Sequence, residues 1–117
     1  MIDVNHWYDP SSASGQAMRT RTEADGKYFT FEVYCAYMSI LFLVDGFERA
    51  GSTDKEAVNA ALASSTLNVD FMPYGPTKMV NGQNMGSRAV AIQAQKGDVE
   101  VIAPASYASA SAIFPRS

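Results

Sequence analysis

The sequence contains a single cysteine, Cys35, and a single histidine, His6, among its 117 residues. One cysteine cannot form a disulfide within the chain, and one histidine removes most zinc sites, which need several Cys or His ligands. Positive charge is also scarce: nine Lys and Arg stand against twelve Asp and Glu, which gives a formal net charge of −3. Because nucleic-acid-binding domains usually carry a basic stripe, we expect no nucleic-acid partner.

Several motifs that carry enzyme chemistry are also missing. The chain has neither a glycine-rich phosphate loop nor the Gly-x-Ser-x-Gly turn of hydrolases, and no second group is spaced to orient His6 as a base. We therefore expect no catalytic residue, no metal and no cofactor, and a protein that is not an enzyme. The most apolar run, residues 33–44, is interrupted only by Ser39 and is shorter than the ~20 residues that span a bilayer. The N-terminus has no signal-peptide pattern.

The sequence does have a long apolar helix pattern. Residues 27–50 contain no proline and end at Gly51, a typical C-terminal cap, so they predict one helix. Thr53 and Glu56 have the spacing of a capping box, which predicts a second helix from there to about Ser65. The two together form a predicted helical hairpin. The first helix is apolar nearly all round, so it needs cover on more than one side.

Strand and turn patterns surround the predicted hairpin. Alternation over residues 2–6 predicts a short strand with one buried face, and residues 68–72 fit another short strand. Residues 11–20 fit either a helix or an irregular loop. Residues 73–82 are punctuated by Pro, Gly and Asn-Gly and predict a loop region that is not helical.

The C-terminal third shows the clearest β pattern. Residues 90–95 and 99–103 alternate on either side of the turn Lys96-Gly97-Asp98, which predicts a β-hairpin. Taken together, the patterns predict an α/β fold: a helical hairpin, short strands and a C-terminal β-hairpin.

Three neighbouring residues are candidates for ligand contact. Trp7 and Tyr8, with His6 as a weaker candidate, follow the first predicted strand, where aromatic rings can stack on a ligand. An ordinary position in the core or at its rim is the alternative for each. Cys35 lies inside the apolar helix and is interpreted as a small buried hydrophobe rather than a nucleophile. The six methionines are scattered along the sequence, which favours core packing over a thioether metal site.

Five short patterns occur in an order that resembles a known family. They are VNHWYDP at 4–10, GFERAGSTDKEAVNAAL at 46–62, Gly75-Pro76 with NGQN at 81–84, IQAQKGD at 92–98, and residues 101–104. As a set they resemble the C-terminal part of the type I periplasmic solute-binding proteins, the branched-chain amino acid and amide receptors of ABC transporters. One residue departs from the family pattern: Met38 stands where relatives often carry an acidic residue.

The resemblance implies that residues 1–117 form a single partial domain, the C-terminal fragment of a protein with two α/β lobes. Such a protein closes its lobes on a small solute, an amino acid, an amide or an aromatic acid, and delivers the solute to a cognate ABC permease. It also implies a periplasmic location, and a cleft in which Trp7 and Tyr8, and less strongly His6, contact the ligand.

Two alternatives to a transport receptor remain open from the sequence. The same fold serves as the ligand-sensing domain of amide-responsive regulators and receptors, and the chain can also be a free-standing small interaction protein. The chain itself agrees with a fragment, because only about half a domain's strands are present to cover a helix that is apolar all round. We therefore expect the chain to self-associate, with the helix at residues 27–50 pairing across a two-fold axis.

Overall fold

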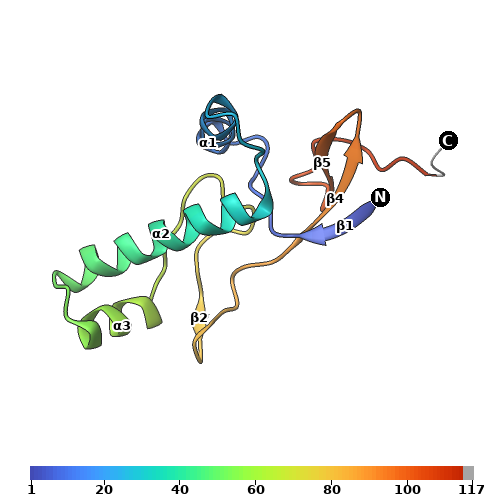
Figure 1. The fold of residues 1–117 in the computed structure, drawn as a ribbon. Coiled ribbons are helices and arrows are strands. Elements are labelled where there is room, and N and C mark those ends of the chain that lie inside the picture. Colours follow the sequence, from blue (N-terminus) through green and yellow to red (C-terminus); the bar gives the residue numbers. More distant parts are fainter. Residues whose placement is uncertain (115–117) are drawn as a thin grey trace.

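The computed structural model describes residues 1–114, and its helices and strands confirm a mixed α/β fold (Figure 1). The elements are, in chain order, β1 (Ile2–Asn5), α1 (Ala13–Ala24), α2 (Phe31–Ala50), α3 (Lys55–Ala63), β2 (Met79–Val80), β3 (Gln83–Asn84), β4 (Val90–Gln95) and β5 (Asp98–Ala103). The strands of this described part form one antiparallel sheet in the order β1-β4-β5 and a separate antiparallel pair, β2-β3.

The C-terminal hairpin confirms the sequence prediction. Strands β4 and β5 are joined by Lys96 and Gly97, which both have positive φ (52° and 87°), as the tightest hairpin turns require. Gln93 is buried in the middle of β4, although its type predicts exposure. Its side-chain amide explains this, because it donates to the backbone oxygen of Ile113 (3.0 Å) and accepts from the backbone nitrogen of Ile113 (2.9 Å).

The first strand exists, but the prediction that it buries one face is wrong. Ile2 and Val4 are both exposed, because β1 is an edge strand that pairs only with β4 and nothing packs on their side. The short strand predicted over residues 68–72 is also wrong. This segment ends in a turn that places Phe71 in the core and directs its backbone oxygen to the amide of Asp9 (2.8 Å).

The loop predicted over residues 73–82 is confirmed as non-helical, and its end forms the first part of a small hairpin. Asn81 and Gly82 both have positive φ (51° and 78°) and join β2 to β3. An Asn-Gly pair favours this turn because both residues tolerate the left-handed region.

Helix α1 resolves the open choice over residues 11–20 in favour of a helix. Ser12 caps it by accepting a hydrogen bond from the backbone of Gly15 (3.1 Å). Gly15 itself is required by packing, since a Cβ at this position would lie 2.5 Å from the Tyr8 ring. One turn further along the same helix face, Arg19 forms an ion pair with Asp98 of β5 (2.6 Å) and so links α1 to the sheet.

Helix α2 begins four residues later than the sequence predicts. Residues 27–30 are not helical: Phe29 is buried in the aromatic core, and Thr30 has the extended backbone of an N-cap. The predicted end is confirmed: Gly51 has left-handed backbone angles (φ 59°, ψ 23°), and its amide donates to the backbone oxygens of Phe47 and Glu48.

The helical hairpin is confirmed, although its cap is not the predicted one. Asp54, not Thr53, caps α3 by accepting from the backbone nitrogen of Ala57 (3.0 Å). Helix α3 ends at Ala63 rather than near Ser65. It packs closely on α2 at Gly46, where a Cβ would lie 2.6 Å from the Leu62 side chain.

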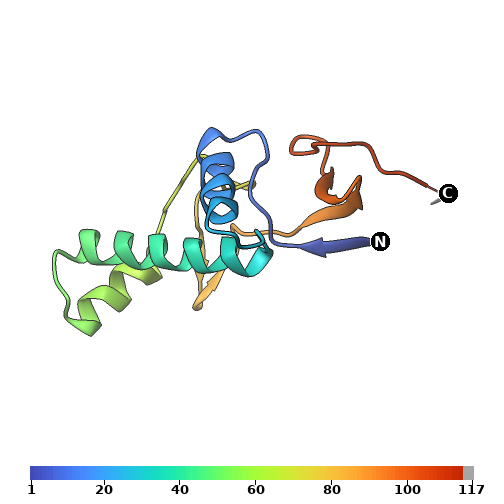
Figure 2. The same ribbon diagram turned by 45° about the horizontal axis from the view of Figure 1, so that its top comes forward.

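The core lies where α1, the start of α2 and the sheet meet, and it is rich in aromatic rings. Its buried side chains are Trp7, Tyr8, Met18, Phe29, Tyr34, Phe71, Val90 and Val101. The rest of the molecule extends away from this core, as Figure 2 shows for the α2–α3 hairpin. The described chain measures 55 × 32 × 20 Å with a radius of gyration of 16.1 Å, against the roughly 13 Å of a compact domain of this length.

Candidate functional site

Two of the three predicted ligand-contact residues lie in the core. Trp7 and Tyr8 are only 4% and 2% exposed, and both rings meet Phe29 edge to face with ring centres 5.4 Å apart. Their edges border a hollow of about 410 Å³ that also contains the ion pair between Arg19 and Asp98. The structure therefore gives both rings the core position that the sequence left as the alternative.

His6 lies in a different environment from its two neighbours. Its side chain is exposed and borders an open pocket of about 590 Å³ between α2 and the segment that leads into the β2-β3 hairpin. The other residues that line the pocket are Tyr34, Cys35, Met38, Ser39, Phe42, Met72, Thr77, Met79, Gly82, Asn84 and Ser87. The three consecutive candidates are thus separated, and only His6 faces the larger pocket.

The pocket gathers much of the sulfur in the chain. Cys35 and Met38 reach it from one face of α2, and Met72 and Met79 reach it from the loop and from β2. The sequence interpretation of the methionines as scattered core residues therefore missed this cluster. Cys35, Met38 and Phe42 recur at i, i+3 and i+7 and share a helix face, which is a signal present in the sequence. No sequence period places Met72 or Met79 beside them.

The lining of the pocket contains no Lys, Arg, Asp or Glu. Burial raises the pKa of Tyr34 to about 12, so its hydroxyl stays protonated at neutral pH. Burial also raises the pKa of the Cys35 thiol, with a smaller contribution from Glu32, so the thiolate is disfavoured. The site offers hydrogen bonds and an apolar floor, and no activated nucleophile.

One polar side chain at the pocket rim is held in a fixed orientation. The Asn84 side-chain oxygen accepts from the backbone nitrogens of Lys78 (2.9 Å) and Gly86 (3.0 Å). Its amide nitrogen has no hydrogen bond to any of residues 1–114 and remains a donor at the rim. A bound solute with a carbonyl or hydroxyl oxygen can therefore be recognised there.

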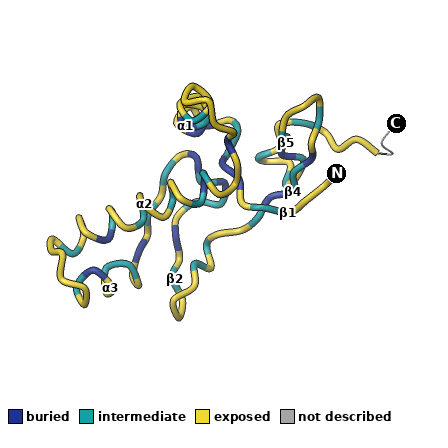
Figure 3. The backbone as a smooth tube through the Cα atoms, in the orientation of Figure 1, coloured by how far each residue is buried: buried dark blue, intermediate teal, exposed yellow. Residues whose placement is uncertain are grey.

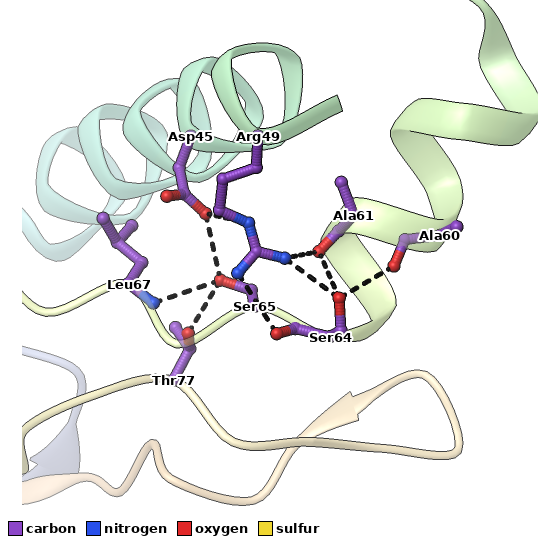
Figure 4. Close-up of polar contacts among 8 residues, drawn as sticks. All are labelled: Asp45, Arg49, Ala60, Ala61, Ser64, Ser65, Leu67 and Thr77. Carbon is purple, nitrogen blue, oxygen red and sulfur yellow. Dashed lines mark hydrogen bonds and ion pairs between the residues drawn. The ribbon is translucent and has the colours of Figure 1, made fainter. Parts of the chain in front are cut away.

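A second polar cluster, at the C-terminal ends of α2 and α3, is structural (Figure 4). The Arg49 guanidinium donates to the backbone oxygens of Ala61 and Ser64 at the C-terminal end of α3, and the Ala61 oxygen also accepts from the Ser64 backbone nitrogen (3.3 Å). Ser65 is buried and bonds to Asp45 (3.3 Å) and to Thr77 (2.9 Å). The cluster joins α2, α3 and the approach to β2, and its member Thr77 also lines the pocket.

The described residues contain no group of three or more His, Cys, Asp or Glu side chains placed to hold a metal ion. Across residues 1–114, no helix combines the length and the apolar character needed to cross a membrane. No family model matches the chain, and no curated protein matches it.

Proposed function

We propose that the chain is the C-terminal portion of a small-solute receptor of the type I periplasmic solute-binding family, which delivers its ligand to a cognate ABC permease. The proposal rests first on the ordered sequence patterns, which run from the strand at residues 4–10 to the C-terminal hairpin. A periplasmic location is part of the proposal and follows from the same resemblance.

One structural observation supports a solute-binding role in particular. His6, the residue that follows β1, borders an open pocket whose floor is apolar and whose rim carries hydrogen-bonding groups. Sites for small molecules are mostly apolar, with a few placed polar groups, and this pocket fits that description. The sequence has no set of residues spaced to act together in catalysis, which favours ligand binding over an enzymatic reaction.

The chemistry of the pocket favours some ligand classes over others. A ligand that carries a full charge would lose hydration there without a Lys, Arg, Asp or Glu partner from the pocket. Of the classes that the resemblance implies, a neutral amide therefore fits the pocket better than an amino acid or an aromatic acid.

The chain offers its own reporter for a binding test, because His6 is the only histidine. NMR of the His6 imidazole can be followed while acetamide, urea, leucine or benzoate is added to the full chain. We expect acetamide or urea to shift the imidazole signal saturably and to raise the melting temperature. If none of the four compounds does so, a solute site in this pocket is contradicted.

Two variants separate pocket binding from effects elsewhere. His6→Ala removes an exposed side chain from the pocket. We expect the dissociation constant of the ligand to rise about tenfold or more, so that the same ligand concentration raises the melting temperature less. Met85→Ala changes another exposed side chain, one that does not line this pocket, and should bind as the unmodified chain does. Trp7→Ala is unsuitable, because removing a buried ring disrupts the core whatever its role in binding.

A further inference from the structure

The chain after β5 folds back onto the β1-β4-β5 sheet. Residues 109–113 belong to no helix or strand, and most of their side chains are exposed. Ile113, the largest of them, is 48% exposed, and Figure 3 shows the chain after β5 mostly in the exposed class. Burial of side chains therefore does not explain why this segment lies on the sheet. We call residues 109–113 the strap.

The first part of the strap covers one edge of the sheet, at β5. Within residues 1–114, β5 pairs only with β4, so its other edge has no strand beside it. The backbone N–H of Val101 donates to Ser109 Oγ (3.0 Å), and the backbone oxygen of Val101 accepts from the backbone nitrogens of Ser109 (2.8 Å) and Ala110 (3.2 Å). The strap therefore satisfies both backbone groups of an edge residue, as a peptide does when it adds to the edge of a sheet.

The second part of the strap is held by two glutamines of β4. Gln93 and Gln95 are two positions apart, so both side chains leave the face of the sheet opposite to the buried Val90, and we call this the outer face. The Gln93 amide binds both backbone groups of Ile113. The Gln95 amide nitrogen donates to Gln93 Oε1 (2.7 Å) and to the backbone oxygen of Ser111 (2.8 Å). The two side chains form one hydrogen-bonded unit directed at peptide groups.

The strap is recognised almost entirely through its backbone. Apart from the Ser109 hydroxyl, which contacts Val101 and Glu100, no strap side chain forms a hydrogen bond with any of residues 1–114. A glutamine amide such as that of Gln93 can bind an N–H and a C=O at once, and every residue type except proline offers both. The outer face therefore has the donors and acceptors to bind an extended peptide with little regard to its side chains.

We propose that the outer face and the adjoining β5 edge are a binding site for an extended polypeptide backbone, and that the strap is its occupant within the same chain. Because the strap is attached through the short loop after β5, it competes at an effective concentration of about millimolar, and a separate peptide binds where the strap has been weakened. The site is distinct from the pocket beside His6, whose lining includes neither Gln93 nor Gln95. Peptide binding here does not depend on the proposed transport function.

The test weakens the strap and leaves the sheet unchanged. Ser109→Ala removes the hydroxyl that binds Val101, and Ile113→Pro removes the N–H that binds Gln93; the two together give the strap variant. The probe is a fluorescein-labelled peptide of residues 108–114 with an amidated C-terminus, added at up to about millimolar concentration. Fluorescence anisotropy should show at least about tenfold tighter binding to the strap variant than to the unmodified chain. Equal affinity for the two chains, or no binding to the strap variant, would overturn the proposal.

Changes in the peptide show whether its backbone is what binds. N-methylation at Ile113 removes the N–H that Gln93 Oε1 accepts, and should weaken binding about tenfold or more. N-methylation at Ala112, whose N–H has no partner among residues 1–114, should leave the affinity nearly unchanged, and so should Ile113→Ala. Equal weakening by the two methyl groups would contradict recognition through the Ile113 peptide group.

Changes in the sheet locate the site. In the strap variant, Gln95→Ala removes the donor to Ser111 and should weaken peptide binding about fivefold, whereas Ala94→Ser changes an exposed residue on the opposite face and should not. Gln95 is only partly buried, so this variant should keep the circular dichroism spectrum of the unmodified chain. Where the double substitution in the strap unfolds the chain, Ile113→Pro alone, at an exposed position, is the strap variant. Peptide binding that Gln95→Ala leaves unchanged would contradict this face as the site.

Discussion

The two ends of the molecule use their apolar residues in opposite ways. In the sheet, Val90 and Val101 are almost completely buried, and the rings of Trp7 and Tyr8 close the core beside them. In the hairpin, α2 is rich in apolar residues yet leaves Ile40, Leu43 and Val44 exposed, and polar contacts around Arg49 and Ser65 hold α3 in place. The sheet end is therefore a closed core, whereas the hairpin end leaves apolar side chains in contact with solvent.

The apolar content of a helix or strand and the burial of its side chains are therefore separate properties. A helix that is apolar on most sides buries only what its neighbours can reach. Here α3 is short and packs on one side of α2, and α1 borders Tyr37 and Ile40 across a hollow without burying them.

A matched pair of valines tests this comparison most strongly. Val101→Ala removes two methyl groups from a fully buried site and should lower the free energy of unfolding by about 2 kcal/mol. Val44→Ala removes the same atoms from a side chain that is 44% exposed, and should cost less than about 1 kcal/mol in dilute protein. Urea denaturation measures both. Equal losses would show that the two regions do not differ as described.

The next prediction concerns what holds the short helix of the hairpin. Asp54→Ala removes the cap of α3 and should lower the free energy of unfolding by about 1 kcal/mol, while Thr53→Ala should leave it nearly unchanged. Thermal or urea unfolding of both variants tests the assignment. A larger loss for Thr53→Ala would restore the cap that the sequence spacing predicts.

The smallest expected effect is on the reactivity of Cys35, on the pocket side of α2. Since burial raises the pKa of its thiol above the ordinary value of 9.0, the thiolate fraction at pH 8 is below that of free cysteine. Alkylation by iodoacetamide should therefore be slower than for free cysteine at this pH, and its rate should still be rising above pH 9. A rate profile that levels off near neutral pH would mean an activated thiol instead.

Local chemistry made part of this fold predictable from sequence. The β4-β5 hairpin and the Gly51 cap depend on residues within a few positions of each other, and both were correctly predicted. The start of α2 was predicted too early, because Phe29 is buried against Trp7 and residues 27–30 stay outside the helix, and this is a tertiary contact. Propensity alone does not contain that contact.

The candidate site was predictable only in part, for a related reason. Of the three adjacent residues His6, Trp7 and Tyr8, the pocket includes only His6, because the chain leaves β1 and turns its two aromatic rings into the core. Met72 lies in an irregular loop and Met79 in the two-residue strand β2, and no sequence periodicity places either beside Cys35 and Met38. Side-chain direction at the end of a strand is set by what packs there, and one sequence does not specify it.

Hydrogen–deuterium exchange tests most directly the central claim that the sheet end is a closed core whereas the apolar face of α2 is exposed. The account predicts that exchange is slower in β4 and β5 than in residues 37–47 of α2, since the core of the sheet is complete and α2 is covered only in part. Equal protection of the two regions, or slower exchange in α2 than in β4 and β5, would contradict it.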